Sequence, residues 1–167
     1  MDFNFCLRQL ADNARVLQHL VLGIEAEQAR WKPGTEDWSV LEVINHLADE
    51  EREDFRPLFE SAFTGRAKAP HDPGEWIATR GYNTRDLAAS AADFMQERER
   101  SLAWLRGLKD PALEGSVVSP WEGFSAGDVL ASWVAHDILH QRQLVELKWA
   151  YALEHYVPFN PGYAGDW

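Results

Sequence analysis

The chain has 167 residues, of which 46% are apolar, and this is enough for one sizeable hydrophobic core. Its 27 acidic and 16 basic side chains give a net charge of −11, which argues against binding to nucleic acids or to anionic membranes, because both depend on Lys and Arg. The single cysteine, Cys6, excludes an internal disulfide framework. No apolar run is long enough to span a membrane and the first residues lack a basic leader, so we expect a cytoplasmic protein.

The first half of the chain is expected to form two amphipathic helices. The first covers about residues 3–27, where apolar side chains recur in steps of three and four. The second begins after Ser39, which forms a capping box with Glu42, and continues to about residue 63. Pro57 is expected to kink the second helix or to end a segment near Arg56.

The second half is expected to form two more helices, at about residues 84–105 and 125–153. Two longer connections rich in Gly and Pro, 64–83 and 106–124, separate these elements, and a short hairpin is one interpretation of the second connection. The aromatic, proline-rich tail at 156–167 is expected to lie extended against the bundle. The sequence therefore predicts an all-α protein, an up-down four-helix bundle formed by a single domain over residues 1–167.

Two charged runs are interpreted mainly as solvated helix faces. They are residues 49–54 in the second helix and residues 96–100 in the third. Glu50 is the exception in the first run, because it follows His46 by one helical turn.

His136 and His140 are the most informative pair in the fourth helix. They lie four residues apart, so they share one helical face, and that face continues the apolar stripe that includes Trp133 and Leu144. Two imidazoles at core positions need polar partners, since an unpaired buried polar group costs a few kcal/mol. A shared metal ion is one explanation, and structural histidines with hydrogen-bond partners are the other.

His46 on the second helix can complete a metal site with His136 and His140, because bundles build such sites from inward side chains on facing helices. Three imidazoles suit zinc, nickel, copper or iron(II), and three protein ligands leave a position for water or substrate. The loop residue His71 is a further candidate, although a lone loop histidine is usually exposed.

The segment from His136 to His140 also resembles the zinc-protease signature, with Asp137 in place of its glutamate. A third ligand six residues further on would be Glu146, but the helix continues there without a glycine turn. Six helical residues turn the chain by about 600°, so Glu146 points away from the pair and the protease interpretation is rejected.

With these motifs in place, the chain resembles the DinB-like superfamily of metal-binding four-helix bundles, which includes bacterial thiol-dependent S-transferases. The resemblance rests on Trp38-Ser39, on the segment from Asn45 to Glu50, and on the segment from His136 to Leu144. It implies that His46, His136 and His140 are the metal ligands. It also implies a divalent ion, zinc or nickel in most members, and a homodimer in many.

The function implied by the resemblance is the transfer of a low-molecular-weight thiol, such as bacillithiol or mycothiol, to an electrophilic small molecule. The metal would lower the pKa of the bound thiol. Glu50 would be the catalytic residue that accepts the proton or binds a ligand imidazole, with a surface carboxylate as the alternative, and Asp137 and Gln143 would support the ligands. A metal-dependent hydrolase that activates water, and a non-catalytic metal-binding stress-response protein, remain the other possibilities.

Overall fold

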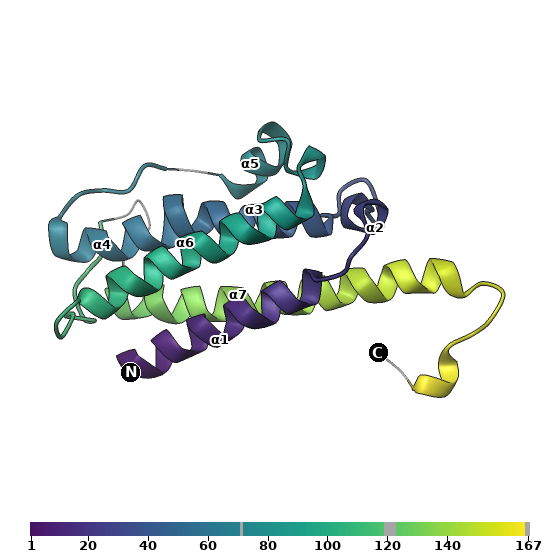
Figure 1. The fold of residues 1–167 in the computed structure, drawn as a ribbon. Helices are drawn as coiled ribbons and strands as arrows, with labels where there is room; N and C mark the ends of the chain where they lie inside the picture. The colour runs from purple at the N-terminus through teal and green to yellow at the C-terminus, as the bar shows by residue number, and fades with distance from the viewer. Residues whose placement is uncertain (71, 119–122, 166–167) are drawn as a thin grey trace.

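The computed structural model describes residues 1–70, 72–118 and 123–165 as a bundle of helices (Figure 1). The predicted all-α four-helix bundle is confirmed. The only β-pairing among the described residues is one isolated bridge between Ser116 and Ser125, so no hairpin strands form there. The helical elements are α1 (Phe3–Val21), α2 (Ala26–Arg30), α3 (Val40–Glu50), η1 (Glu51–Phe55), α4 (Arg56–Thr64), α5 (Pro73–Thr79), η2 (Tyr82–Thr84), α6 (Leu87–Gly107), α7 (Ala126–Tyr156) and η3 (Gly162–Ala164).

Helix boundaries follow the capping signals. Ser39 accepts a hydrogen bond from Glu42 N, and the Glu42 carboxylate accepts one from Ser39 N, so the predicted capping box is confirmed. The first helix ends earlier than predicted, at Val21, because Gly23 adopts a positive φ of 77° and a separate short helix, α2, follows.

The second helix contains a π-helical turn, η1, between α3 and α4. Pro57 lies in the first turn of α4, directly after η1. Proline has no N–H to donate to the carbonyl of residue 53, and the wider π turn adjusts the backbone at this point. The predicted irregularity near Arg56 is therefore confirmed.

The helices run in the order up-down-down-up, rather than in simple alternation. α3 and α6 are parallel, since Asn45 bonds to Ser90 near their starts and Arg56 bonds to Glu97 further along both. The cause is the connection after α4, which carries the chain back along the bundle before α6 begins (Figure 1).

An ion network is buried where the four long helices meet. Arg98 on α6 donates to both oxygens of Asp137 on α7, at 2.8 Å each, and to Glu51 Oε1 on η1, at 2.9 and 2.7 Å. It also donates to the Leu10 carbonyl of α1, and Trp133 Nε1 donates to the same Glu51 oxygen. Arg98, Glu51 and Asp137 are each at most 1% exposed.

This network corrects part of the interpretation of the two charged runs as solvated faces: Glu53, Gln96, Glu99 and Arg100 are exposed as expected, but other members are buried. Glu97 and Arg98 are 3% and 1% exposed, and Asp49, Glu50 and Glu51 are buried as well. The charges of Asp49, Glu51, Glu97 and Arg98 are paired across helices: Asp49, for example, accepts hydrogen bonds from Tyr82 and Arg80 at 2.5 Å each. Paired charges can be buried at positions that a hydropathy pattern assigns to solvent.

The C-terminal tail does not pack as predicted. Figure 1 shows that α7 projects beyond the other helices and that the following segment bends back below the end of α7. Phe159 is 81% exposed and Tyr163 is fully exposed. The expectation that this segment lies against the bundle is therefore wrong for the described residues 157–165.

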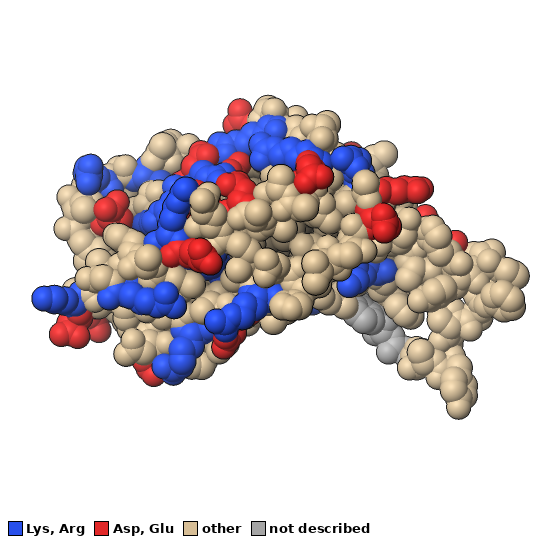
Figure 2. All heavy atoms as spheres, in the orientation of Figure 1, with Lys and Arg blue, Asp and Glu red and all other residues tan. Residues whose placement is uncertain are grey.

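The surface carries both signs of charge. On the face drawn in Figure 2, Lys and Arg side chains are interleaved with Asp and Glu. None of the helices in the described parts of the chain combines the length and apolar character that crossing a membrane requires.

Replacing Arg98 tests how much the buried ion network contributes to the free energy of unfolding. We expect Arg98→Met to lower the free energy of unfolding by about 3–5 kcal/mol, because the buried carboxyl groups of Glu51 and Asp137 would lose their cation. Arg100→Met on the same helix is the control, since Arg100 is exposed and its loss should cost less than about 1 kcal/mol. Urea unfolding monitored by circular dichroism measures both, and equal losses would contradict the expectation.

Candidate metal centre

Three imidazoles converge between α3 and α7. His46 Nε2 lies 3.3 Å from His136 Nε2, and His140 Nε2 lies 3.1 Å from the same atom. These nitrogens form the one group of His, Cys, Asp or Glu ligand atoms in the described residues that is suited to hold a metal ion, with all members within 4.8 Å of one another. The structure thus brings together all three histidines that the sequence predicts as ligands.

The spacing of the nitrogens fits a small cation. Two imidazole nitrogens bound tetrahedrally at about 2.0–2.1 Å from zinc lie about 3.3–3.4 Å apart, close to the two observed separations. The pKa of His136 is lowered to about 3, mainly by burial. Positive charge on His140 and Arg98 lowers it further. The pKa of His140 is also lowered, mainly by burial. Both imidazoles are therefore neutral at pH 7, which is the form that binds metals.

Local helix structure explains the convergence. The capping box at Ser39 begins α3 so that His46 lies on its second turn, facing α7 and almost fully buried. On α7, the four-residue spacing of His136 and His140 places their rings 4.4 Å apart. The candidate ligand set therefore combines one histidine of α3 with two from one face of α7.

Aromatic side chains hold the three imidazoles from two sides. The Trp38 ring stacks on His140 at 6.0 Å and meets His46 edge-on at 4.9 Å. Phe55, at the end of η1, meets His136 edge-on at 5.1 Å. Phe55 could not be predicted as a neighbour of His136 from the sequence, because the π turn that directs it towards α7 has no clear sequence signal.

Gln143 orients one of the imidazoles. Its Oε1 lies 2.7 Å from His140 Nδ1, one turn further along α7. An amide oxygen can only accept, so this contact keeps the proton on Nδ1 and leaves the Nε2 lone pair directed at the other two histidines.

Glu50 lies beside the triad but is not hydrogen-bonded to it. Its Oε1 is 3.7 Å from His46 Nδ1, which is too long for a hydrogen bond. The pKa of Glu50 is raised to about 9, mainly by burial. A hydrogen bond with Asp54 and the negative charge of Asp54 raise it further. In the metal-free protein Glu50 is therefore protonated at neutral pH and cannot accept a proton there.

Two other predicted participants lie elsewhere or outside the description. Asp137 follows His136 in sequence, but its carboxylate points to Arg98 rather than to the triad. His71 lies outside the described residues.

The chain is similar to known proteins in sequence and in fold. The sequence model of the DinB superfamily matches residues 9–144. Among solved structures, the chain is similar to YfiT from Bacillus subtilis, described as a probable metal-dependent hydrolase with an unusual four-helix bundle topology. The TM-score is 0.79 at 22% identity, covering 90% of this chain and 87% of YfiT. No curated protein matches the chain significantly.

Gln143 can be tested by replacement. We expect Gln143→Leu to weaken zinc binding by about tenfold or more, because His140 would lose the acceptor that orients it. Arg142→Gln is the control, since Arg142 is exposed and pairs with Glu146 instead. Competition with a chromogenic chelator measures the affinities, and an unchanged affinity in Gln143→Leu would remove the orienting role.

The raised pKa of Glu50 predicts a pH dependence of stability. Between its ordinary value of 4.5 and about 9, folded metal-free protein holds a proton that the unfolded chain has released. The free energy of unfolding should therefore fall as the pH rises from 7 to 8.5, and Glu50→Gln should reduce this fall. Urea unfolding at both pH values measures the effect, with the exposed Glu99→Gln as control. An identical fall in parent and Glu50→Gln would contradict the assignment.

Proposed function

The chain belongs to the DinB superfamily, and on this premise we propose that it is a divalent-metal-dependent enzyme whose ion is bound by His46, His136 and His140. The observation that carries the proposal is the convergence of three imidazoles at Nε2 separations of 3.1 and 3.3 Å. Zinc and nickel are the proposed ions, since imidazole suits both and the family resemblance favours them. When bound, such an ion acts as a Lewis acid that lowers the pKa of a coordinated thiol or water.

The surrounding residues prepare the site for this chemistry. Gln143 presents the His140 lone pair, and Trp38 and Phe55 pack against the ligand rings and keep bulk water from those sides. Glu50 holds a proton next to His46. A metal ion bound to His46 would lower the pKa of Glu50. These side chains orient the ligands and control protons without binding substrate themselves.

The proposed reaction is S-transfer from a low-molecular-weight thiol to an organic electrophile. The thiol loses its S–H proton to solvent, its sulfur forms a bond to the electrophilic carbon, and the bond from that carbon to the leaving group breaks. The leaving group departs with the bonding electron pair. This choice of nucleophile follows the family resemblance, as the described residues carry no separate thiol-recognition motif.

Hydrolysis is the second candidate, because YfiT is described as a probable metal-dependent hydrolase. The same three histidines would serve, with water replacing the thiol as nucleophile. At 22% identity the similarity to YfiT establishes the shared fold only, so the reaction has to be determined directly.

Metal content tests the site itself. We expect about one zinc or nickel ion per chain in tag-free protein, and its loss in His136→Ala. His155→Ala is the matched control, because His155 is on the same helix but exposed. Elemental mass spectrometry measures all three proteins. If the parent binds no zinc or nickel even after incubation with either ion, the proposal fails.

Two assays on the metal-loaded protein then separate the candidate reactions. Thiol-dependent consumption of an electrophile such as 1-chloro-2,4-dinitrobenzene, absent in His136→Ala, would support S-transfer. Cleavage of esters or amides without added thiol would support hydrolysis instead. Stoichiometric metal with neither activity would favour a non-catalytic metal-binding protein.

A further inference from the structure

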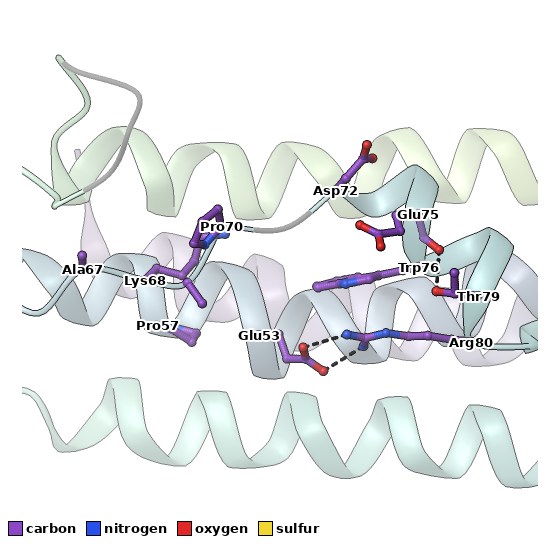
Figure 3. Close-up of a pocket in the computed structure, with 11 residues that line it drawn as sticks. Glu53, Pro57, Ala67, Lys68, Pro70, Asp72, Glu75, Trp76, Thr79 and Arg80 are labelled. Carbon is purple, nitrogen blue, oxygen red and sulfur yellow. Dashed lines mark hydrogen bonds and ion pairs between the residues drawn. The ribbon is translucent and has the colours of Figure 1, made fainter.

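In the cavity of about 610 Å³ beside α5, the largest side chains already contact one another (Figure 3). Arg80 donates to both oxygens of Glu53, and its guanidinium covers one face of the Trp76 ring at 4.1 Å. Trp76 itself is only 7% exposed. The outer side of α7 differs from this cavity, because apolar side chains point into solvent there.

Five successive exposed positions of α7 lie on one side of the helix and carry no charge. They are Ala131, Ser132, Ala135, Ile138 and Leu139, called the α7 face below. With 3.6 residues per turn, these positions fall within an arc of about 120°. Ile138 is 51% exposed and Leu139 is 57% exposed. An uncharged surface more than two turns long is unusual on the solvent side of a helix, where charged and polar side chains are the rule.

Charged side chains border the α7 face at both ends. Asp128 precedes Ala131 by about one turn and Arg142 follows Leu139 by about one turn, both exposed and on the same side of the helix. Arg142 pairs with Glu146 at 3.2 Å, but its side chain remains 71% exposed, and such a surface pair is weak. An uncharged centre with a charged border is typical of a surface that binds another protein.

The borders of the α7 face are complementary in charge to a second copy of the same face. When two α7 helices run antiparallel about a two-fold axis at Ala135, positions equally far before and after Ala135 lie opposite each other. Asp128 and Arg142 are each seven positions from Ala135. Each carboxylate of one copy therefore faces a guanidinium of the other, and two ion pairs close the ends of the contact.

The uncharged positions are complementary in size in the same register. Ala131 of one copy lies opposite Leu139 of the other, and Ser132 lies opposite Ile138. Ala135 lies opposite Ala135 of the other copy, so the two helices can approach closely at the axis. Each large side chain thus meets a small one, and the contact removes the exposed parts of Ile138 and Leu139 from water.

We propose that the α7 face is the contact surface of a symmetric homodimer, in which two α7 helices cross antiparallel at Ala135. His136 and His140 point away from this face, towards His46 on α3. The two candidate metal centres therefore lie on opposite sides of the helix pair. The inference goes beyond the proposed function and does not depend on it.

Sedimentation velocity of the metal-loaded full chain, over about 1–100 µM, tests the dimer. We expect a dissociation constant in the micromolar range, because a contact based on one helix pair is smaller than a standard interface of about 800 Å² per partner. Leu139→Glu should raise the dissociation constant by about tenfold or more, since it buries a carboxylate without a partner. Leu22→Glu is the matched control, because Leu22 is 74% exposed but lies at the end of α1.

Cysteine cross-linking tests the register. In a Cys6→Ser background, Ala135→Cys should form an intermolecular disulfide under mild oxidation, because its two copies meet at the axis. Ala131→Cys is the matched control. Its two copies would be about 12 Å apart along the helix axes, beyond the Cα separation of about 7 Å that a disulfide can span.

Three results would overturn the inference. The first is a parent that stays monomeric at every concentration, whether the α7 face remains in water or the chain's own residues 157–165 cover it. The second is an equal dissociation constant for the parent and Leu139→Glu, with circular dichroism confirming that the variant is folded. The third is equal cross-linking of Ala135→Cys and Ala131→Cys, which would place the contact elsewhere on the surface.

Discussion

The buried guanidinium of Arg98 is the interaction on which the arrangement of the bundle depends. It joins α6 to Asp137 on α7, to Glu51 on η1 and to a carbonyl of α1. A charge at this depth is tolerated only when its hydrogen bonds are satisfied, so the four elements can meet in few relative positions. A purely apolar core would tolerate sliding of one helix past another far more readily.

The histidine triad depends on the same contacts. Glu51 accepts from Trp133, and His136 follows Trp133 by one turn on α7. The contact between Glu51 on η1 and Trp133 on α7 therefore also fixes the position of His46 along the bundle axis relative to His136, since α3 continues directly into η1. The π turn then directs Phe55 towards both Trp133 and His136. The arrangement of the three histidines and the ion pairs of Arg98 thus both depend on the same register between η1 and α7.

Sequence periodicity predicted the helices and the shared face of His136 and His140 because both follow from local rules. His136 and His140 replace apolar residues in a regular stripe, and Ser39 with Glu42 marks a helix start whatever surrounds it. The burial of Arg98 was missed, because a charged residue that pairs across helices has the same local pattern as one in solvent. The direction of α6 was missed as well, since the length of a connection does not specify which end of the bundle it reaches.

Burial makes the groups around the triad neutral, although the chain as a whole is strongly acidic. It lowers the pKa of His136 to about 3 and raises that of Glu50 to about 9, so neither is charged at pH 7 without a metal. A divalent cation would therefore meet the uncharged imidazoles of His136 and His140 and one carboxyl group able to ionise in response. The polar contacts of Glu50 on α3 continue through Asp54 on η1 to Lys68 in the connection after α4. The candidate metal site is thus one end of a buried polar path that links three consecutive parts of the chain.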